Sequence, residues 1–302
     1  MSIEAFGKVG LIYGGCSSER EVSLNSGRSV ANALKLLGVD SVLLDGDGYY
    51  LVERIKQDNI RRCIIMQHGG QGEGGALQSM LDAVDVPYTG SSGKGCYLAM
   101  DKAISKAIWQ QYQIPMPKTH RMKHATDIDD LTFPLAVKPV NQGSSIGVTK
   151  VKNKDQLDDA YQYAAQFGDV IAEKWIEGKE VTVSIVNGHV LPSVWIKPKR
   201  EFYDYEAKYS KDSGTEYICP SDLDEQTEAR IKEIALLAFE SLHCSGWGRV
   251  DFIVDHQMNP YLFEVNTVPG MTELSLVPRA AKAYGWEFDQ LVLEILKTSL
   301  KG

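Results

Sequence analysis

The chain has 302 residues, enough for two or three packed domains, because single hydrophobic cores rarely grow beyond ~250 to 300 residues. Hydrophobic residues make up 43% and charged residues 24%, which is typical of a globular protein and excludes a disordered chain. The net charge of -8 opposes nonspecific attraction to nucleic acid or to an anionic membrane, so we expect neither as a partner. Any bound phosphate must therefore meet a local positive site.

Five widely spaced cysteines form no Cys-x-x-Cys pair, so we expect reduced, packed thiols and neither a disulfide framework nor a structural zinc site. They are Cys16, Cys63, Cys96, Cys219 and Cys244. Charged residues such as Glu4 and Lys8 leave no apolar signal-peptide core near the start, and no run of ~18 uninterrupted apolar residues occurs. We therefore expect a cytoplasmic location.

The first part of the chain is predicted to alternate strands and helices, as in a parallel sheet. A short apolar run is separated by Gly14-Gly15 from an amphipathic segment that ends before Gly38. The predicted elements are a strand at 9–13, a helix at 18–37, strands near 39–44 and 63–67, and a helix at 76–83. We place the end of this domain near Gly90.

Residues 91–95 are predicted to form a linker, followed by a helix through Trp109. A small α+β domain is expected next, with strands at 135–138 and 148–151 and a helix at 157–167. Strands dominate from Val170 onward, and Asn187-Gly188 predicts a hairpin turn joining 181–186 to 190–194. Helices are predicted at 225–242 and 288–300. The domains expected are therefore 1–90, 91–172 and 173–302.

Two polar residues of the first domain are candidates for a binding site. Glu19 lies where the loop after the first strand enters a helix, in the crevice where open α/β sheets bind ligands. Its carboxylate could hold a substrate ammonium group or simply complement the helix dipole. His68 also follows a strand, and it could belong to the same site or pack in the interior.

The spacing Gly70-x-Gly72-x-x-Gly75 matches the dinucleotide-binding fingerprint. We reject that interpretation because no acidic residue stands ~20 positions further on to bind a ribose. The Walker loop, the His-Glu-x-x-His motif and the Gly-x-Ser-x-Gly elbow are also absent from the sequence. Any phosphate chemistry must therefore use another scaffold.

Lysines and a Gly/Ser loop in the middle of the chain are candidates for binding phosphate. Lys138 ends a predicted strand just before the loop 141–147, whose glycines can turn backbone N–H groups toward an anion, and Ser144 adds a hydroxyl. An ordinary hairpin turn is the alternative. Lys102 begins a helix after the capping residue Asp101, so it adds charge to a positive helix terminus or is simply solvated.

The segment 202–209 is unusually aromatic for a loop. Such a segment is predicted to close over a bound molecule rather than to remain in solvent. A packed loop without a ligand is the alternative interpretation.

Two strands predicted late in the chain, 249–255 and 261–266, place acidic side chains together. Alternation puts Arg249 and Asp251 on the same face as Glu264 and Asn266. The apolar partners predict the register, with these pairs opposite each other: Val250 and Val265, Phe252 and Phe263, Val254 and Tyr261.

This register sets Asp251 opposite Glu264. Like charges that face each other across strands are destabilising, so the pair indicates a compensating cation. Two carboxylates and the amide of Asn266 are oxygen ligands suited to Mg²⁺. The alternative is a solvated acidic face in which Arg249 pairs with Asp251.

Taken together, these residues resemble one family, the D-alanine:D-alanine ligases of the ATP-grasp superfamily, over essentially the whole chain. The segments that carry the resemblance are 14–23, His68-Gly69, Gly72-Glu73, 100–102, Gly143-Ser144-Ser145-x-Gly147, 173–175, 203–209, 246–251 and 264–272. The resemblance implies an α/β multidomain ATP-grasp fold with a Rossmann-like parallel-sheet domain at the N-terminus. It also implies cytoplasmic homodimers, with ATP and D-alanine as substrates.

The resemblance further implies roles for individual residues. Substrate contacts are expected at Glu19, His68, Ser275 and Leu276, and catalytic roles at Glu19, Ser144, Tyr209, Arg249 and Gly270. ATP contacts are expected at Lys102, Lys138, Ser145, Glu173, Lys174, Trp175, Ile176, Glu180 and Lys208. The ligands of Mg²⁺, for which Mn²⁺ is expected to substitute, are Asp251, Glu264 and Asn266.

The chemistry of amide formation agrees with this resemblance. A carboxylate is too electron-rich for an amine to attack, and phosphorylation by ATP supplies a leaving group. The reaction implied is the joining of two D-alanine molecules through a D-alanyl phosphate, for peptidoglycan precursor synthesis. Three alternatives remain: a ligase that accepts D-lactate, which Tyr209 disfavours by resemblance, an NAD-dependent oxidoreductase, and a nucleotide-binding module without activity.

Overall fold

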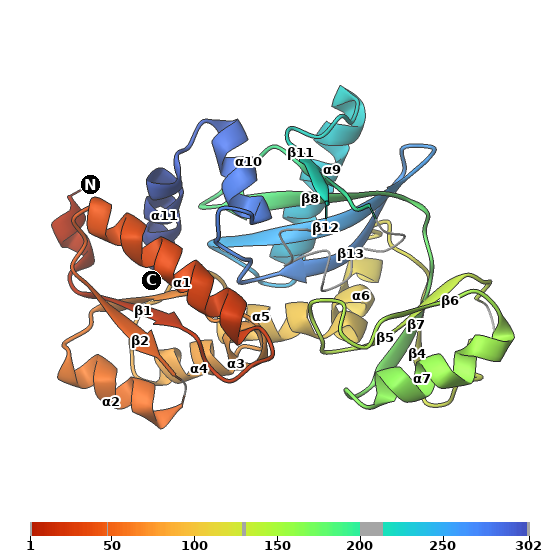
Figure 1. The fold of residues 1–302 in the computed structure, drawn as a ribbon, viewed down its shortest axis with the longest axis horizontal. Helices are drawn as coiled ribbons and strands as arrows, with labels where there is room; N and C mark the ends of the chain where they lie inside the picture. The colour runs from red at the N-terminus through yellow and green to blue at the C-terminus, as the bar shows by residue number, and fades with distance from the viewer. Residues whose placement is uncertain (1, 47, 129–130, 200–213, 301–302) are drawn as a thin grey trace.

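The computed structural model describes residues 2–46, 48–128, 131–199 and 214–300. Within these residues the strands form three sheets, which follow one another along the long axis of the molecule (Figure 1). No helix in this described part of the chain combines the length and the apolar character needed to cross a bilayer. The sheets and the helices between them bring distant segments together around one cleft.

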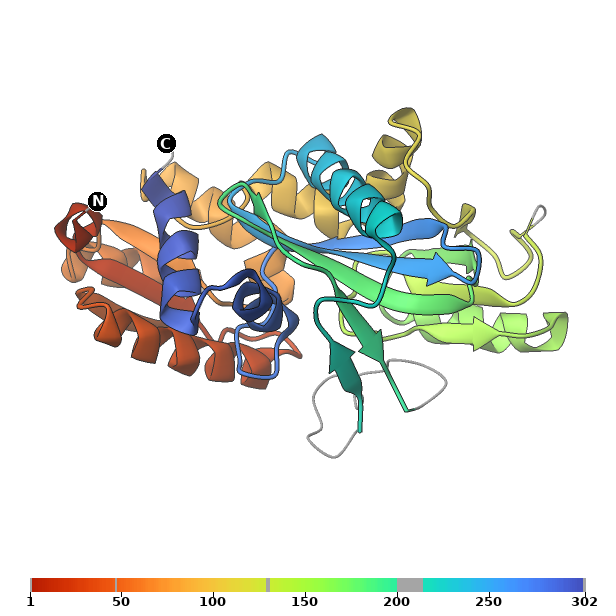
Figure 2. The ribbon, with the colours of Figure 1, turned by 90° about the horizontal axis from the view of Figure 1, so that it is seen from above.

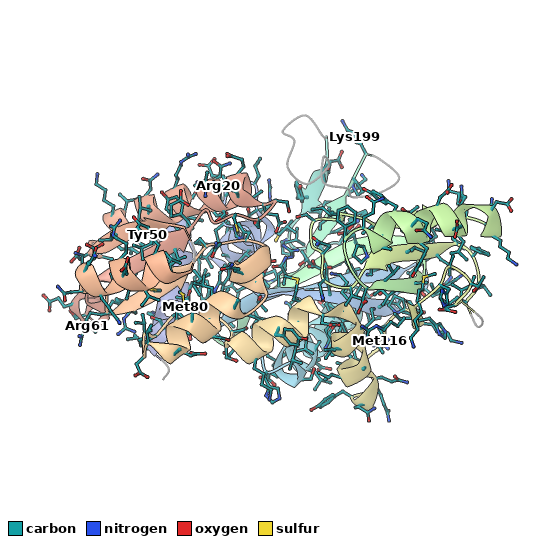
Figure 3. The ribbon with its side chains drawn as sticks, turned by 90° about the horizontal axis from the view of Figure 1, so that it is seen from below. Arg20, Tyr50, Arg61, Met80, Met116 and Lys199 are labelled. Carbon is teal, nitrogen blue, oxygen red and sulfur yellow. The ribbon has the colours of Figure 1, made fainter. Side chains whose placement is uncertain are left out.

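The N-terminal lobe is built on a parallel sheet of order β2-β1-β3. Its elements are η1 (Ile3–Phe6), β1 (Val9–Tyr13), α1 (Arg20–Leu36), β2 (Ser41–Asp45), α2 (Tyr49–Gln57), β3 (Arg62–Ile65), α3 (Gly70–Glu73) and α4 (Ala76–Ala83). The parallel sheet, the first strand and α4 are confirmed as predicted, whereas α2 was not anticipated. Figure 3 shows this lobe from below, with Arg20 at the first turn of α1 and Tyr50 on α2.

The linker predicted at 91–95 is wrong, because a helix already begins at Gly93, whereas the predicted start of a helix at Lys102 after the cap Asp101 is confirmed. Two helices occupy this region, α5 (Gly93–Met100) and α6 (Lys102–Gln111). The break falls at Asp101, whose extended backbone and side chain cap α6 by accepting from the N–H groups of Ala103 and Ile104. The cap gives Lys102 the first position of a new helix, next to the cleft.

An antiparallel sheet of order β4-β7-β5-β6 forms the lobe at the opposite end of the molecule (Figure 1). Its elements are β4 (Thr119–Met122), β5 (Leu135–Pro139), β6 (Thr149–Val151), η2 (Lys154–Gln156), α7 (Leu157–Ala165) and β7 (Val170–Lys174). Leu135 and Val137 of β5 are fully buried against Ala160 and Ala164 of α7 in a core of their own. The Gly/Ser loop, residues 141–147, follows the C-terminal end of β5.

The third sheet lies between these two lobes and has the order β11-β10-β8-β12-β13. Its elements are β8 (Gly178–Val186), β9 (His189–Val190), β10 (Val194–Lys197), β11 (Glu216–Ile218), α9 (Glu225–Ser241), β12 (Trp247–Asp255) and β13 (Pro260–Asn266). Helix α9 covers one face of this sheet (Figure 2). Alternation in β8 and β12 leaves the opposite face to polar side chains, which point into the cleft.

The hairpin predicted at Asn187-Gly188 is confirmed, with Val186 opposite His189. Its return strand is shorter than expected, because β9 ends at Val190 and Pro192 has no N–H group to donate to the ladder. The chain rejoins β8 only as β10, where Val194 lies opposite Thr182.

The register predicted for the last two strands is correct on one side of Asp251 and wrong on the other. Val250 lies opposite Val265 and Asp251 lies opposite Glu264, as expected. The register then shifts, so the partner of Phe252 is Leu262 instead of Phe263, and that of Val254 is Pro260 instead of Tyr261. A β-bulge at this point gives β13 one extra residue, which apolar alternation does not reveal.

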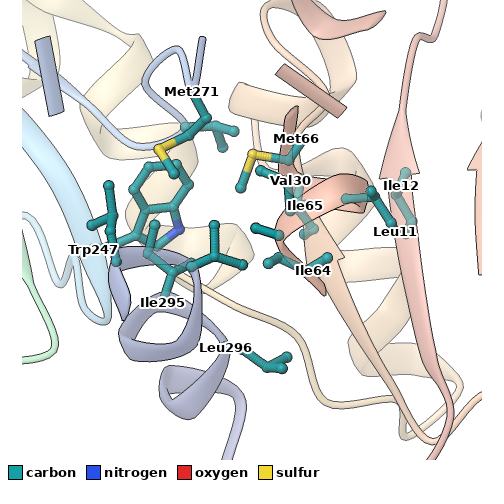
Figure 4. Close-up of a cluster of buried hydrophobic side chains, with 14 of the residues drawn as sticks. Leu11, Ile12, Val30, Ile64, Ile65, Met66, Trp247, Met271, Ile295 and Leu296 are labelled. Carbon is teal, nitrogen blue, oxygen red and sulfur yellow. The ribbon is translucent and has the colours of Figure 1, made fainter. Parts of the chain in front are cut away.

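The C-terminal segment returns to the N-terminal lobe through α10 (Leu276–Tyr284), α11 (Phe288–Lys297) and η3 (Thr298–Leu300). Helix α11 packs against α1. Figure 4 shows Trp247 and Met271 facing Met66 across the junction, all of them fully buried in one apolar cluster. The cleft is therefore bordered on one side by a lobe that is joined to the third sheet through a shared core.

Candidate active site

Two adjoining cavities of about 650 and 510 Å³ lie along the cleft. The first lies between the N-terminal lobe and the strands β12 and β13, and the second lies between the β4-β7-β5-β6 sheet and β8. Both cavities share Lys102, Gly143 and Glu264 in their walls. A molecule bound in one cavity can therefore react with a molecule bound in the other.

The structure sorts the candidate residues between these cavities. The first cavity is lined by Glu19, His68, Ser144, Arg249, Asp251, Glu264, Asn266, Gly270, Ser275 and Leu276. The second cavity is lined by Lys102, Lys138, Ser145, Glu173, Lys174, Trp175, Ile176 and Glu180. Lys208 and Tyr209, with the aromatic segment 202–209, lie outside the described residues.

Glu19 and Ser144 connect the N-terminal lobe to the Gly/Ser loop. Glu19 lies just before α1 and is 7% exposed, and its Oε1 accepts a hydrogen bond from the hydroxyl of Ser144. Ser17 stabilises the turn, because its hydroxyl accepts from the N–H of Glu19 and donates to the carbonyl of His68. A carboxylate held in this way presents negative charge to the first cavity.

Backbone conformations at the Gly/Ser loop direct its polar groups toward the cleft. Ser144 and Ser145 both have left-handed backbones, with φ of 51° and 60°. Gly147 has φ of 74°, and a Cβ there would lie 2.6 Å from Cγ of Pro139. Lys102 anchors the start of the loop, since its Nζ donates to the carbonyl of Gln142 at 2.6 Å.

His68 lines the first cavity with both ring nitrogens engaged. Nδ1 lies 2.7 Å from the carbonyl of Val268, and Nε2 lies 2.8 Å from Oγ of Ser26. Burial lowers the pKa of His68, and a carbonyl can only accept, so a neutral ring with its proton on Nδ1 satisfies both contacts. Ser26 also accepts from the N–H of Met271, so His68 fixes the segment that carries Gly270.

Glu73 is a second buried carboxyl group at this cavity, and no role was predicted for it. Burial raises the pKa of Glu73 well above its usual value, and repulsion from Glu19 adds to the effect. A protonated Glu73 can share the space with the Glu19 carboxylate without a second negative charge. Of this pair, the Glu19 carboxylate therefore remains for a cationic ligand.

Arg249 and Asp251 form a fixed pair on β12. Nε and Nη2 of Arg249 donate to the two carboxylate oxygens of Asp251, each at 2.7 Å. The hydroxyl of Thr182, which lies opposite Asp251 on β8, donates to Oδ1 at 2.7 Å. The guanidinium group is therefore held against the cavity wall by a buried, bidentate interaction.

The acidic hairpin has the donor set of an oxygen-coordinated cation. Asp251, Glu264 and Asn266 line one cavity, and Oδ1 of Asn266 is buried with no hydrogen-bond partner among the residues described. The described residues contain no cluster of three or more His, Cys, Asp or Glu side chains arranged for a metal. Two carboxylates and an orphaned amide oxygen nevertheless fit Mg²⁺, which completes its shell with water and phosphate oxygens.

The turn that precedes α10 closes the far end of the first cavity. Oγ of Ser275 accepts from the N–H of Thr272 at 2.9 Å, and Ser275 stands at the N-cap position of α10 without capping it through its side chain. Gly270 brings its backbone close to this group, because a Cβ there would lie 2.9 Å from Oγ of Ser275. Backbone N–H groups at a helix start favour the carboxylate of a ligand.

The second cavity contains a buried carboxylate between two lysines. Glu173 of β7 is 3% exposed, and its Oε2 lies 3.0 Å from Nζ of Lys138, while Oε1 lies 3.1 Å from Nζ of Lys106. Burial by itself would raise the pKa of Glu173, but the two lysines outweigh it and hold the pKa below its usual value. The carboxylate is therefore ionised.

The chain that follows Glu173 forms the other wall of this cavity. The ammonium of Lys174 is turned toward the carbonyls of Thr132 and Phe133, at 3.1 and 3.2 Å. Lys150 lies over the ring of Trp175, 4.6 Å from its centroid. These contacts leave the backbone around Ile176 at the cavity surface, where a planar heterocycle can hydrogen-bond to it.

Four further buried polar residues beside the site were missed in the sequence, although three of them carried a readable signal. Thr182 and Ser184 continue the polar alternation from Glu180 along an otherwise apolar strand, so they face Asp251 and Arg249. Lys106 lies four residues after Lys102 on the same face of α6. The hydroxyl of Ser26, which bridges two distant segments, has no such signal.

Comparisons with known proteins bear on this geometry. Residues 102–297 match the protein family described as D-ala D-ala ligase C-terminus. The chain is 44% identical to the D-alanine--D-alanine ligase of Francisella philomiragia over 291 residues, which cover 96% of this chain and 97% of that relative. The crystal structure of D-alanine--D-alanine ligase from Bacillus anthracis is similar, with a TM-score of 0.87, 35% identity and coverage of 97% of each chain. The structure of the Bacillus anthracis ligase complexed with ATP gives a TM-score of 0.85, 32% identity and the same coverage.

Proposed function

Because the chain belongs to the D-alanine--D-alanine ligase family, we propose that its first cavity binds two D-alanine molecules and its second cavity binds ATP. The protein is an ATP-dependent ligase that joins two D-alanine molecules, with ATP as co-substrate. The remaining questions are which residues hold each substrate and how they promote the reaction.

One observation supports the assignment of the site most strongly. A carboxylate from the N-terminal lobe, a hydroxyl from the Gly/Ser loop and a guanidinium from β12 line one cavity, next to the lysines of the other. An amide-forming ligase needs an anion for an ammonium group, cations for phosphate and a donor for the developing oxyanion. The cleft brings all three together.

We assign the first D-alanine to Glu19. Its carboxylate holds the substrate ammonium group, and Ser144 fixes the orientation of that carboxylate. The substrate carboxylate then points toward the shared wall at Lys102 and attacks the terminal phosphorus of ATP. A new bond from oxygen to phosphorus forms while the bond to the β-phosphate bridging oxygen breaks, which yields D-alanyl phosphate and ADP.

The second D-alanine is assigned to the end of the cavity at Ser275 and Leu276. Its carboxylate meets the start of α10, and His68 fixes the neighbouring segment that carries Gly270. After the ammonium group has lost a proton, the amine attacks the acyl carbon and phosphate leaves. The tetrahedral oxyanion would accept from Arg249 and from the N–H of Gly270, and one such donor contributes about 3 kcal/mol.

ATP is assigned to the second cavity. Lys102, Lys138 and Ser145 would contact its phosphates, while Glu173, Lys174, Trp175, Ile176 and Glu180 would surround the nucleoside. Lys208 and Tyr209 remain proposed contacts to phosphate and to the closed loop. Asp251, Glu264 and Asn266 would hold Mg²⁺, or Mn²⁺ in its place, and the ion would supply charge neutralisation at the phosphate oxygens.

The expectations on cellular context and domains also remain proposals. We propose that the protein acts in the cytoplasm as a homodimer and supplies D-alanyl-D-alanine for peptidoglycan synthesis. We also propose that the chain divides into the domains 1–90, 91–172 and 173–302. The net charge of -8 supports the absence of nucleic-acid and membrane partners.

The test is phosphate release from ATP and Mg²⁺ with D-alanine present or absent, followed by identification of the product. Release is expected to require D-alanine and to yield one D-alanyl-D-alanine per phosphate. Glu19→Gln is expected to raise the KM for the first D-alanine, because the amide removes the charge that pairs with the ammonium group. Release that does not depend on D-alanine would overturn the proposal, and D-alanyl-D-lactate formed in a competition with D-lactate would redirect it.

A further inference from the structure

Lys106 is a buried lysine that lines neither cavity. It lies on the inner face of α6, one turn after Lys102, and is 4% exposed. Lys138 and Glu173 form the cavity wall in front of it. Its Nζ lies 3.1 Å from Oε1 of Glu173, in an ion pair whose two side chains are each only 4% exposed.

Stability does not account for a lysine at this position. A buried ion pair gains little over well-packed apolar side chains, because desolvation of both ions offsets their attraction. Burial lowers the pKa of Lys106, and Lys138 and Lys102 lower it further, while only Glu173 opposes them. An apolar side chain would avoid this penalty, so the charge itself is the feature to explain.

The balance of charges at the cavity wall gives a reason. Glu173 offers one oxygen to each of two lysines, so the three side chains together carry one net positive charge. Without Lys106, the carboxylate of Glu173 would neutralise Lys138, and this cluster of side chains would lose its net charge. Polyphosphate needs positive charge at this wall, because the whole chain is acidic.

We propose that Lys106 is a positioning residue that pairs with Glu173 from behind and so leaves the charge of Lys138 available to the phosphates of the nucleotide. The proposal rests on the assignment of ATP to the second cavity. Lys106 acts through Glu173 and Lys138 and does not touch the substrate. Removing its charge should therefore weaken binding of phosphate and leave binding of the nucleoside unchanged.

The experiment compares ADP with adenosine. Calorimetric titrations of the full chain measure the Kd of each ligand for the wild type, Lys106→Met and Lys106→Arg. For Lys106→Met the Kd of ADP is expected to rise about tenfold, equivalent to about 1.4 kcal/mol, while the Kd of adenosine stays the same. Lys106→Arg keeps the charge and should recover most of the ADP affinity. In turnover, Lys106→Met should raise the KM for ATP but leave the KM for D-alanine unchanged.

Lys297→Met is a matched control. Lys297 also pairs with a mostly buried carboxylate, at 2.6 Å from Oε1 of Glu294, but it lies on α11 away from both cavities. This variant removes one charge from the chain and one ion pair from the fold. Its affinities for ADP and adenosine should equal those of the wild type.

If Lys106→Met leaves the buried carboxylate of Glu173 without enough positive charge for the protein to fold, a second pair of variants, which lack this carboxylate, keeps the proposal testable. Lys106→Met is then combined with Glu173→Gln and compared with Glu173→Gln alone. The neutral amide no longer opposes the charge of Lys138, so adding Lys106→Met to Glu173→Gln should leave the ratio of ADP to adenosine affinity unchanged. The proposal is overturned if Lys106→Met alone weakens both ligands equally or neither of them, or if adding Lys106→Met to Glu173→Gln still lowers the ADP affinity about tenfold. If wild-type protein fails to bind ADP at all, the proposed function fails instead.

Discussion

At the scale of single residues, the carboxylate of Asp251 organises the first cavity. Arg249 donates to both of its oxygens, and Thr182 donates to Oδ1 from the neighbouring strand. A hydrogen bond to a charged group contributes about 1.5 to 3 kcal/mol, and without Thr182 the atom Oδ1 keeps only Nε of Arg249 of these two donors. Thr182 therefore contributes to the orientation of Arg249 without reaching a substrate.

Thr182→Val removes this donor while keeping the shape of the side chain. We expect the free energy of unfolding to fall by about 1.5 to 3 kcal/mol, because the valine leaves Oδ1 of Asp251 with one donor fewer. The kcat should fall about tenfold, since Arg249 is less firmly fixed. Urea unfolding and phosphate release measure the two effects, and Thr182→Ser should restore both.

Ser184→Ala is the control for this prediction. Ser184 lies two residues further along β8, opposite Arg249, and its buried hydroxyl makes no hydrogen bond among the described residues. Removing that hydroxyl should leave stability within about 0.5 kcal/mol of the wild type. An equal loss in both variants would show that packing, not the hydrogen bond to Asp251, is responsible.

At the scale of elements, the Gly/Ser loop depends on a backbone that L side chains rarely adopt. Gly147 combines φ of 74° with close neighbours, since a Cβ would lie 2.6 Å from Pro139 and 2.8 Å from Phe167. Both side chains belong to the lobe on which the loop is built. The loop that presents Ser144 and Ser145 to the two cavities therefore returns to its sheet through one obligatory glycine.

Gly147→Ala is expected to lower the free energy of unfolding by about 2 to 3 kcal/mol, from backbone strain and from crowding together. It should also raise the KM for ATP several-fold, because Ser145 shifts with the loop. Gly38→Ala is a matched control, with φ of 72° and nothing within 4 Å of the added Cβ. That variant should lose only about 1 to 2 kcal/mol and keep the KM. Similar KM values for the two variants would contradict the role assigned to the loop.

The same elements show what could be predicted from the sequence. Period-two alternation placed Asp251 opposite Glu264 correctly, because both faces of that hairpin have distinct polarity. The bulge beyond Asp251 was missed, because one extra residue in β13 does not interrupt the apolar pattern on either side of it. The cap at Asp101 and the start of a helix at Lys102 were predicted correctly, because an aspartate before a helical run is a recognisable N-cap. The preceding helix α5 was missed, since its glycines at 93 and 95 are typical of a linker. Contacts between distant segments, such as Ser26 with His68 and Met271, depend on the tertiary fold alone.

At the scale of the whole molecule, the cysteines report on how tightly the lobes pack. All five thiols are free, as the sequence indicated. Cys16 is exposed on the loop before α1, whereas Cys63, Cys96 and Cys244 are buried. Burial raises the pKa of each of these three thiols to about 12, and that of Cys219 to about 11.

A thiol reagent such as a disulfide dye should therefore modify the folded protein at one position only. The thiolate is the reactive form, and a thiol with a pKa near 12 is ionised in only about one molecule in 10⁴ at pH 8. Cys16 should react within seconds and Cys219 much more slowly. The other three should react at the rate of unfolding, and all five should react at once in denaturant. Cys16→Ser should abolish the fast phase. A second fast-reacting thiol in the native protein would contradict the prediction, because it would mean that the lobes separate far more often than their shared core allows.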